Sequence, residues 1–410
     1  MKIAMLTMGS RGDVQPFAVL GKALQQRGHE VTLASAKNYS SFIASYGLRF
    51  EPVEADFQEI LNSPEGKKMM SNPLSARKHM DRLIYPMIYD SLKTFYRVAG
   101  ENDKVLFHVK AMADYFGEAM HDKLIRANVV PAIEPTSAFV NPVLSSLPLP
   151  SFMNRFSYKL SDLGMKMMSK PVNKFRQEVG ITTKYKKPQL PSLYGISTLF
   201  LQQPKDYPAN AHFTGFWSED SATALAEDVL QFLDAGPAPL LITFGSMPFE
   251  SRMSLPATLN RLTKELNIRL IVIKGWGLTD TAMLEQNSNI KVIESAAYDK
   301  LFPHVKAVIQ HGGIGTIAAC LKAGIPFFTC PVLYPLGDQH FWGMVAYNKG
   351  IGLKPVPLKK LNENDFIKAA KLLIESADLY CNARILMEKL QGENGIVNAV
   401  HLIEEKYKAH

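Results

Sequence analysis

The chain has 410 residues, of which 47% are hydrophobic and 20% are charged, the balance of an ordinary globular protein. This length exceeds what one hydrophobic core usually serves, so two domains are expected. The three cysteines show no Cys-x-x-Cys spacing, which argues against a zinc motif and a disulfide framework. The net charge of +8 is not accompanied by an aromatic-and-basic module, so nucleic acid is not an expected partner.

The first half of the chain begins with a strand–helix–strand unit. The apolar pattern predicts a strand over residues 2–7, a helix over 14–27 and a strand over 31–34. Gly28 follows the helix, where a left-handed C-cap is expected. Such a unit opens a parallel α/β sheet. Later strands are predicted at 105–108 and 129–133, with helical character between them over 111–127.

A turn-rich break at residues 204–210 separates this half from a second α/β series. After the break, Ser221 is suited to be the N-cap of a helix over 222–233. Strands of the second series are predicted at residues 240–244, 269–273, 291–294, 305–309 and 326–330. The last segment, 395–410, has the pattern of an amphipathic helix. The layout is therefore two successive α/β domains joined near residues 204–220.

Residues 151–190 are both basic and apolar, with nine Lys and Arg against two Asp and Glu. Such a mixture can rest on an anionic membrane surface, so peripheral membrane contact is one prediction. The simpler alternative is a solvated helix face whose other side packs in the core. The chain enters a strand at once without a signal-peptide pattern, and its longest apolar stretch, 314–336, is interrupted by Lys, Gly and Pro. We therefore expect a cytosolic protein, attached at most to the inner surface of a membrane.

The most informative local pattern is a glycine-rich turn between the predicted strand 305–309 and a predicted helix over 316–323. The polar and small residues of this turn are His311, Gly313, Gly315 and Thr316. Such a turn directs backbone N–H groups and a helix N-terminus at an anion, most simply a diphosphate. Asp338 and Gln339 follow another apolar strand at the same sheet edge, and a carboxylate beside an amide suits sugar hydroxyls. Together they predict a nucleotide-sugar site, whereas the glycines alone would fit an ordinary tight turn.

The first predicted strand leads into a second glycine-containing turn, which carries Asp13. Ligands of open α/β folds bind at the carboxyl edge of the sheet, so Asp13 is placed to abstract a proton as a general base. A helix N-cap is the competing interpretation. Spacing alone favours the N-cap, because Asp is common immediately before a helix.

Three further positions are weaker candidates for the same ligand. Ser246, after the predicted strand 240–244, could meet the diphosphate from a second side, although an ordinary turn explains it equally well. Trp276 and Tyr298 could flank a nucleobase, while plain packing is the simpler explanation for each. No Asp-x-Asp motif occurs in the sequence, so a metal-bridged diphosphate is not expected. The charge must then be offset by N–H groups, His311 and the helix dipole.

In order and spacing these motifs resemble those of the UDP-glycosyltransferase superfamily, whose members have the two-domain GT-B fold. The resemblance is strongest to the branch of sterol glucosyltransferases and glycopeptide-antibiotic glycosyltransferases. It covers essentially the whole chain and includes Gly9-Ser10-Arg11-Gly12-Asp13-Val14-Gln15-Pro16, residues 107–111, 204–217 and 244–246, His311-Gly312-Gly313-Ile314-Gly315-Thr316 and Gly337-Asp338-Gln339.

This resemblance implies an α/β architecture of two Rossmann-like domains facing each other across a cleft. Residues 1–215 would bind the acceptor and residues 216–394 the nucleotide-sugar. Residues 395–410 would form a C-terminal helix that packs back on the first domain.

The resemblance also assigns roles to individual positions. Asp13 takes the place of the general base, and Asp338 and Gln339 match the pair that holds donor-sugar hydroxyls. The positions that match the diphosphate site are His311, Gly313, Gly315, Thr316 and Ser246. Candidates on the acceptor side are Ser10, Arg11, Gly12 and His108. Candidates beside the nucleobase are Trp276, Ala297 and Tyr298.

Two departures from the family pattern are visible. Many relatives have a histidine in place of Asp13, with a partner aspartate about a hundred residues later. Here His108 lies near that partner position, so the His–Asp dyad is not reproduced. Many relatives also have Pro-His where this chain has Ala297-Tyr298, which leaves the donor base less defined than the fold.

The resemblance thus implies an inverting, metal-independent glycosyltransferase. It would move a hexose, with glucose expected, from UDP to a hydroxyl of a small lipophilic acceptor such as a sterol, terpenoid, polyketide, flavonoid or lipid. UDP-glucose would be the co-substrate, with no other cofactor. Two alternatives stay open: a nucleotide-sugar epimerase or hydrolase, which needs no acceptor, and a UDP-sugar-binding protein without catalysis.

Overall fold

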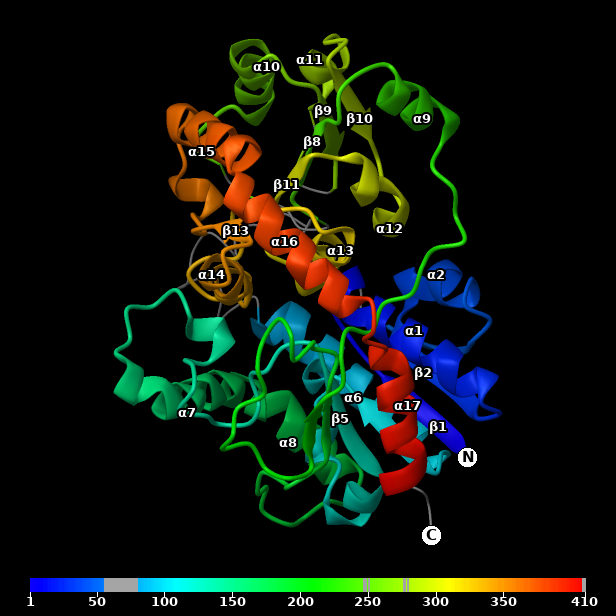
Figure 1. Cartoon of the computed structure of the whole chain (residues 1–410). Coiled ribbons are helices and arrows are strands. Elements are labelled where there is room, and N and C mark those ends of the chain that lie inside the picture. Colours follow the sequence, from blue (N-terminus) through cyan, green and yellow to red (C-terminus); the bar gives the residue numbers. More distant parts are fainter. Residues whose placement is uncertain (55–79, 246–248, 250, 276–277, 279, 408–410) are drawn as a thin grey trace.

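Two parallel β-sheets, one in each half of the chain, form the framework of the molecule (Figure 1). The computed structural model describes residues 1–54, 80–245, 249, 251–275, 278 and 280–407. The first sheet has the order β3-β2-β1-β4-β5-β6-β7 and the second the order β10-β9-β8-β11-β12-β13. The strands of the first sheet are β1 (Lys2–Leu6), β2 (Glu30–Ala36), β3 (Arg49–Val53), β4 (Lys104–Phe107), β5 (Leu124–Asn128), β6 (Ser192–Tyr194) and β7 (Ala211–Phe213). Those of the second are β8 (Leu240–Thr243), β9 (Leu270–Ile273), β10 (Ile290–Ile293), β11 (Ala307–Gln310), β12 (Phe327–Thr329) and β13 (Gly352–Leu353).

Helices connect and cover the strands, as parallel pairing requires. In the first half they are α1 (Arg11–Gln26), α2 (Ser40–Ala44), α6 (Tyr85–Gly100), α7 (Asn154–Met165) and α8 (Ser169–Glu178). In the second half they are α9 (Glu227–Asp234), α10 (Leu255–Leu266), α11 (Ala282–Glu285), α12 (Tyr298–Leu301), α13 (Ile314–Ala323), α14 (Gln339–Asn348), α15 (Glu363–Glu375), α16 (Ala377–Leu390) and α17 (Gly395–Lys406). The predicted class, two α/β domains, is confirmed.

Most predicted strands and helices lie within a few residues of the observed ones, but one region was predicted wrongly. The strand expected at 129–133 is β5, at Leu124–Asn128, and residues 109–123 form short 3₁₀ turns rather than a helix. Met112 (φ 55°) and Gly117 (φ 88°) are both left-handed and interrupt any regular helix. β5 was missed because it contains Arg126, which is buried and paired with Asp114 at 2.8 Å.

The start of α9 was also predicted wrongly. The helix begins at Glu227 after the N-cap Ala226, so Ser221 does not cap it. Instead, the Ser221 backbone N–H donates to Asp299 Oδ2 at 2.8 Å, and the Ser221 hydroxyl accepts from the Thr223 N–H. These bonds hold part of the linker between the sheets against α12, which begins the segment that leads to β11.

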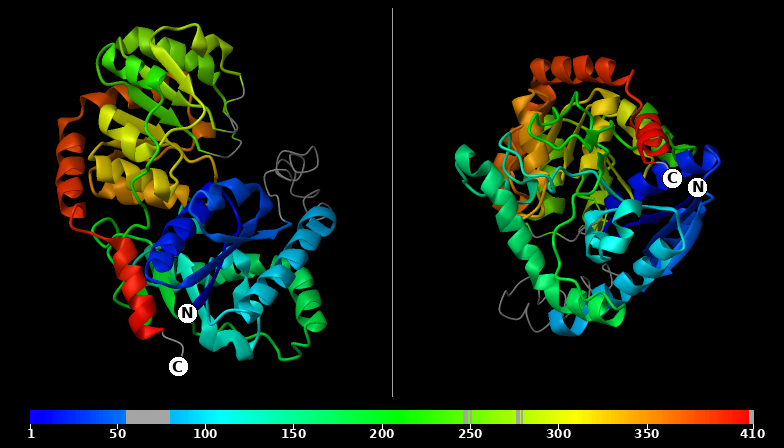
Figure 2. Two further views of the ribbon diagram at one scale, coloured as in Figure 1. Left: turned by 90° about the vertical axis from the view of Figure 1, so that its right-hand side faces the viewer. Right: turned by 90° about the horizontal axis from the view of Figure 1, so that it is seen from below.

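The C-terminal helix α17 lies against α1 in the first half of the molecule (Figure 2). Glu404 accepts hydrogen bonds from Arg27 (2.9 Å) and contacts His29 (3.1 Å). The backbones of Gly215 and Gly395 are so close that a Cβ on Gly215 would lie 2.7 Å from the Gly395 Cα. The chain therefore crosses back to the first half immediately beside the linker by which it left.

Apolar contacts join the two halves near α14. The ring of Phe200 stacks on Trp342 with centroids 5.9 Å apart, and Phe139 packs on Phe341 at 5.2 Å. The Gly337 N–H also donates to the Val143 carbonyl at 3.0 Å. One buried apolar cluster runs through both halves, so the described structure fixes the two sheets relative to each other.

Candidate active site

Each sheet has a topological switch point, the place where neighbouring strands send their connections in opposite directions. In the first sheet it lies between β1 and β4, and in the second between β8 and β11. Ligands of open α/β sheets bind beside such points, at the carboxyl ends of the strands. Asp13 follows β1 and His108 follows β4, while His311 follows β11. The predicted site residues thus lie at the two positions where the topology alone would place a ligand.

Asp13 belongs to the first turn of α1, where it is the third helical residue and not the N-cap. The N-cap is Ser10, whose backbone N–H donates to Asp13 Oδ2 at 2.7 Å and whose hydroxyl lies 3.0 Å from the same oxygen. This arrangement is a capping box, which satisfies an N–H that the helix leaves unpaired. Gly9 permits it, because its φ is 133° and a Cβ there would lie 2.9 Å from Asp13 Cγ. The predicted N-cap was therefore misplaced by three residues, although the side chain does help to start the helix.

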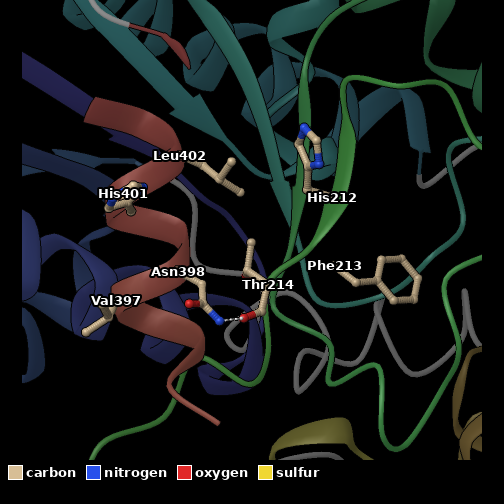
Figure 3. Close-up of a pocket in the computed structure, with 7 residues that line it drawn as sticks. All are labelled: His212, Phe213, Thr214, Val397, Asn398, His401 and Leu402. Carbon is tan, nitrogen blue, oxygen red and sulfur yellow. Dashed lines mark hydrogen bonds between the residues drawn. The ribbon is translucent and has the colours of Figure 1, made fainter. Parts of the chain in front are cut away.

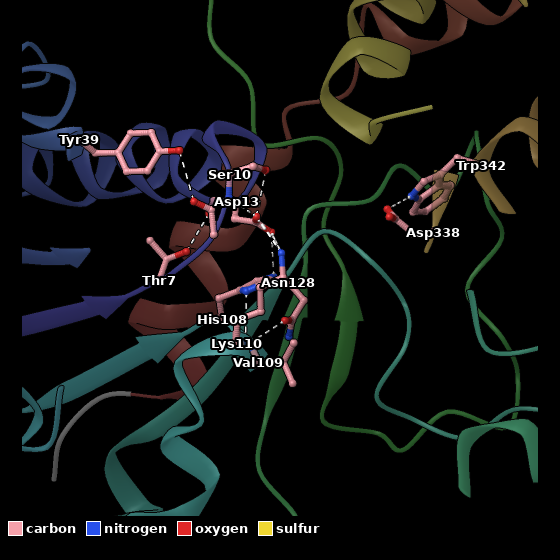
Figure 4. A network of polar contacts seen from close by, with 11 residues as sticks. Thr7, Ser10, Asp13, Tyr39, His108, Val109, Lys110, Asn128, Asp338 and Trp342 are labelled. Atoms are coloured by element: carbon pink, nitrogen blue, oxygen red, sulfur yellow. Dashed lines mark hydrogen bonds and ion pairs between the residues drawn. The ribbon is translucent and has the colours of Figure 1, made fainter. Parts of the chain in front are cut away.

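The Asp13 carboxylate is also clamped by Lys110 (Figure 4). The ammonium Nζ lies 2.8 Å from both carboxylate oxygens. Burial would raise the pKa of Asp13, but the Lys110 charge and the donors of Lys110 and Ser10 outweigh it and hold the pKa below its usual value. Asp13 is therefore ionised at neutral pH. Sequence reasoning gave Lys110 no role, although its position two residues after His108 at the same strand end could have indicated one.

His108 lies beneath this pair and is 4% exposed. The Lys110 backbone N–H donates to His108 Nδ1 at 3.4 Å, so Nε2 carries the proton of the neutral ring. Burial lowers the pKa of His108 to about 4. Nε2 lies 3.7 Å from Asp13 Oδ1, too far for a hydrogen bond. His108 is thus a neutral group behind the base rather than one half of an ion pair.

Two of the other residues predicted on the acceptor side are exposed. Arg11 and Gly12 lie on the open side of the first turn of α1. The Arg11 guanidinium lies over the ring of Phe42, 4.9 Å from its centroid. An exposed cation and an exposed glycine beside Asp13 leave room for a ligand to approach the carboxylate from that side.

At the second switch point, the turn after β11 leads directly into α13. Gly313 is the N-cap, and no side chain caps this helix. The first N–H groups of the helix are therefore not satisfied by a cap, and Gly315 beside them is exposed with open space around it. Gly312 has a φ of 105°, and a Cβ there would lie 2.7 Å from the Gln339 carbonyl oxygen, so only glycine fits. An uncapped, accessible helix N-terminus is a suitable site for an anion.

The His311 ring lies between Gly313 of this turn and Gly245 of the turn that follows β8. A Cβ on Gly245 would lie 2.7 Å from its Cε1, and one on Gly313 would lie 2.6 Å from its Nε2. Its Nδ1 is buried and has no hydrogen-bond partner among the described residues. Burial lowers the pKa of His311 to about 4. The expectation that His311 would offset diphosphate charge therefore changes, because a neutral ring acts as a hydrogen-bonding group and not as a cation.

Asp338 and Gln339 begin α14 but do not play matching roles. The Gln339 Oε1 accepts from the N–H groups of Val332 (2.8 Å) and Leu333 (2.9 Å), so this oxygen holds the preceding loop. Asp338 Oδ2 accepts from the Trp342 Nε1–H at 2.9 Å, and its side chain remains partly exposed. Asp338 is therefore available to a sugar hydroxyl, whereas Gln339 can offer only its Nε2 group.

Asp338 lies in the second half of the molecule, on the opposite side of Figure 4 from Asp13 and Lys110. Burial raises the pKa of Asp338, and the Asp13 carboxylate adds to this effect, whereas the Lys110 charge opposes it. The charges of Asp13 and Lys110 therefore act on Asp338 across the two halves of the molecule. The base candidate of the first half and the sugar candidate of the second half are thus electrostatically coupled.

The residues expected beside the nucleobase are only partly described. Ser246, Trp276 and Gly277 lie outside the described residues. Ala297 is the N-cap of α12, and the Tyr298 ring stacks on Phe302 with centroids 4.6 Å apart. The Tyr298 hydroxyl lies 3.4 Å from Thr243 Oγ1. The Tyr298 ring therefore packs on the core, and its role beside a nucleobase stays a prediction.

The described residues contain no group of three or more His, Cys, Asp or Glu side chains arranged to hold a metal ion. None of their helices is long and apolar enough to cross a bilayer. A pocket of about 410 Å³ lies between β7 and α17 and is lined by His212, Phe213, Thr214, Val397, Asn398, His401 and Leu402 (Figure 3). It contains none of the residues at the two switch points.

Relatives of this chain are glycosyltransferases. Residues 3–109 match the Glycosyltransferase family 28 N-terminal domain. Over 97% of its length the chain is 29% identical to a sterol 3-beta-glucosyltransferase of Debaryomyces hansenii, and it spans only 26% of that longer protein. It is also 29% identical to the O-mycaminosyltylonolide 6-deoxyallosyltransferase of Streptomyces fradiae, with 99% of this chain and 97% of the relative covered.

Solved structures share the whole architecture. The glycotransferase of kitacinnamycin superposes with a TM-score of 0.72 at 16% identity and covers 99% of both chains. The glycosyltransferase VinC in complex with DTDP superposes with a TM-score of 0.66 at 16% identity, covering 98% of this chain and 99% of VinC. The chain therefore shares the two-domain GT-B fold of these structures, and its residues 3–109 are similar to the N-terminal domain of glycosyltransferase family 28.

Proposed function

We propose that this chain is an inverting glycosyltransferase that moves a hexose from a nucleotide-sugar to a hydroxyl of a small lipophilic acceptor. The observation that carries the proposal is the pairing of two unlike sites. A partly buried, ionised carboxylate, Asp13, lies at one switch point, and an uncapped helix N-terminus, that of α13, lies at the other. A base for the acceptor and an anion site for the donor are what such a transfer needs.

The reaction would be a single displacement. The acceptor oxygen attacks the anomeric carbon while the bond from that carbon to the diphosphate oxygen breaks, and Asp13 takes the hydroxyl proton. Attack from the face opposite the leaving group inverts the configuration. General-base assistance of this kind typically contributes about 10²–10⁴ in rate. Holding both substrates between the two domains also makes the encounter effectively unimolecular.

The departing nucleoside diphosphate would lie at the N-terminus of α13. Backbone N–H groups near Gly315 and Thr316 would bind phosphate oxygens, and His311 would add a hydrogen bond from its neutral ring. Such preorganised donors favour the charge that develops as the bond breaks, and removing one typically costs about 10²–10³ in kcat.

Lys110 occupies the carboxylate that would act as the base. Because its ammonium group contacts both oxygens of Asp13, the acceptor hydroxyl has to share the carboxylate with Lys110 or displace it. The pairing keeps Asp13 ionised and also makes it a weaker base. We therefore propose that Lys110 positions the carboxylate in the resting enzyme and moves aside from one oxygen when the acceptor binds.

The donor we propose is UDP-glucose. Its diphosphate suits the α13 terminus, and the free carboxylate oxygen of Asp338 suits hydroxyls of a hexose. The name of the Debaryomyces hansenii relative supports glucose, whereas VinC was solved with DTDP, so the nucleobase needs a direct comparison. The names of the relatives, one a sterol enzyme and one acting on a tylonolide, support a lipophilic acceptor.

A panel assay tests the proposal. The full chain is incubated with UDP-glucose or dTDP-glucose and with sterol, terpenoid, polyketide, flavonoid and lipid acceptors, and the products are analysed by mass spectrometry. Nuclear magnetic resonance then gives the anomeric configuration. A β-linked glucoside from α-linked donor is the expected result. Free glucose or an epimerised donor in reactions without acceptor, together with no glucoside in any reaction, would instead indicate a hydrolase or an epimerase.

A further inference from the structure

An apolar stripe is exposed along α7 and the short turns at its two ends. It consists of residues spaced four, four, three and four apart, which places them on one side of a helix. Their exposed fractions are 83% for Phe152, 48% for Phe156, 37% for Leu160, 58% for Leu163 and 57% for Met167. We call these five residues the α7 stripe. An exposed apolar surface of this kind usually marks a contact site.

The opposite side of α7 packs on the protein through the Tyr158 ring, which is fully buried, and through polar groups. Asn154 is 9% exposed and its amide donates to the Ser137 carbonyl at 3.0 Å. Ser157 is fully buried, and its hydroxyl accepts from the Asn141 N–H at 2.7 Å. The inner side of the helix is thus already filled by one aromatic ring and by hydrogen-bonded polar groups, while further apolar side chains face solvent. Core packing does not explain the stripe.

Basic side chains accompany the stripe. Arg155, Lys159, Lys166 and Lys170 are all exposed, and Asp162 is the acidic residue between them. Arg155 lies 3.7 Å from Asp206, and Lys170 pairs with Asp81. Lys159 and Lys166 form no ion pair with a described residue. The surface therefore carries net positive charge immediately beside its apolar side chains.

We infer that the α7 stripe docks on an anionic lipid bilayer, with its apolar side chains among the acyl chains and its lysines against the headgroups. Residues 152–167 would span roughly 22 Å if fully helical, a length suited to lying in the plane of a bilayer surface. A second copy of the chain is a poorer occupant, because a self-complementary contact would bring the same lysines together. The stripe is also accessible, since α7 lies on the outer surface of the first domain, away from α17 (Figures 1 and 2).

Bilayer docking would bring the enzyme to the phase in which a lipophilic acceptor dissolves; this consequence rests on the proposed function. The docking itself does not, because it needs neither donor nor acceptor. The experiment can therefore treat the two separately. Vesicle binding is measured without substrates, and glycosyl transfer is measured on a water-soluble acceptor without vesicles.

The test is co-sedimentation of the full chain with vesicles of pure phosphatidylcholine and of phosphatidylcholine with phosphatidylglycerol at about 7:3. We expect binding to the mixed vesicles that is at least tenfold tighter than binding to the neutral ones and that weakens as salt is raised. The double variant Phe156→Ser/Leu163→Ser should lose at least tenfold in affinity. Lys159→Glu/Lys166→Glu should lose as much, since each lysine near an anionic surface contributes on the order of fivefold.

A matched control uses an exposed apolar residue and an exposed lysine of α15, on the second domain. Leu372 is 57% exposed and Lys368 is also exposed, so Leu372→Ser/Lys368→Glu should leave vesicle binding unchanged. Circular dichroism and transfer to the soluble acceptor report whether each variant is folded. As a second measurement, Phe156→Trp should give a blue-shifted emission with mixed vesicles.

Equal binding of wild type and both stripe variants, or no binding by folded wild type, would overturn the inference. So would a stripe-dependent dimer in sedimentation velocity without vesicle binding, because the occupant would then be a second copy of the chain. Loss of vesicle binding with retained transfer to the soluble acceptor supports it. A protein that binds vesicles but transfers no sugar would contradict the proposed function and not the docking surface.

Discussion

The two switch points differ in how far their polar groups are already satisfied. At the first, Asp13 is held by Lys110 and by the Ser10 N–H and hydroxyl. At the second, α13 starts without a side-chain cap, and His311 Nδ1 is buried without a partner among the described residues. The acceptor side is therefore internally neutralised, and the donor side is open to an anion. We infer that the donor binds at the open start of α13, whereas the acceptor has to displace the contact between Lys110 and Asp13.

The largest expected effect is at the base. Asp13→Asn should leave UDP affinity intact and slow glycosyl transfer by roughly 10²-fold or more, because the amide cannot take a proton. Initial rates and calorimetry measure the two quantities. Since Asp13 also caps α1, Ser10→Ala is the matched control, which weakens the capping box but keeps the carboxylate. If Asp13→Asn turned over at nearly the wild-type rate, Asp13 would be a capping residue only.

The next largest effect is expected on the donor side, at the turn that leads into α13. His311→Ala should weaken UDP binding and slow transfer together. A hydrogen bond to a charged group contributes about 1.5–3 kcal/mol, which corresponds to roughly ten- to a hundredfold in affinity. Calorimetry with UDP measures it, with the exposed His401→Ala as control. Unchanged UDP affinity would give the His311 ring a purely structural role between Gly245 and Gly313.

Sugar recognition should be separable from nucleotide recognition at Asp338. Asp338→Ala should impair the use of UDP-glucose by an amount corresponding to about 1–3 kcal/mol and change the preference among UDP-hexoses, while UDP affinity stays the same. Asp338→Asn is the control, because an amide can still accept from the Trp342 indole. Unaltered donor ranking in Asp338→Ala would place sugar recognition elsewhere.

Gln339→Ala should behave differently from Asp338→Ala. It leaves the N–H groups of Val332 and Leu333 without their acceptor, so its main consequence is a lower Tm. Thermal unfolding of both variants, compared with their donor preference, distinguishes the two roles. A stable Gln339→Ala protein with altered donor ranking would restore Gln339 as a sugar-binding residue.

Removing the clamp on the base should alter the pH dependence. Lys110 opposes the effect of burial and holds the pKa of Asp13 below its usual value, so Lys110→Met should raise that pKa. The acid limb of the kcat/KM profile should then move to higher pH, with activity lost mainly at low pH. In the wild type the pairing stabilises the fold above the ordinary carboxyl pKa, and this contribution disappears as the pH falls through the lowered pKa. Lys110→Arg should keep the wild-type profile, whereas an unshifted profile in Lys110→Met would contradict the clamp.

The smallest expected effect is that of chelation. Adding EDTA should leave transfer rates largely intact, because the sequence has no Asp-x-Asp motif to hold a metal against the diphosphate. A strict requirement for added magnesium or manganese would show that the donor site needs a cation besides the α13 terminus. Rates with and without each metal, after exhaustive chelation, measure this directly.

The sequence predicted the strongly apolar strands well because their fate depends on local composition. β8, β9 and β11 are short, buried and bounded by turns, and each was placed to within one or two residues. β5 was missed because Arg126 made it look polar, and only its pairing with Asp114, twelve residues away, allows that charge to be buried. For α7 the sequence left open whether the apolar residues pack in the core or meet a membrane surface, and only the tertiary structure shows that they are exposed.

By itself, the sequence determined the two-domain α/β layout, the glycine-rich turn at α13 and the location of Asp13 at a sheet edge. These depend on periodicity, on glycine and on the order of elements along the chain. Only the tertiary structure decided what those residues contact. Lys110 contacts Asp13 across 97 positions of sequence, and the charges of both act on Asp338 in the other domain. Electrostatics falls off with distance in space and not along the chain, so the charge state of the base is a property of the folded molecule.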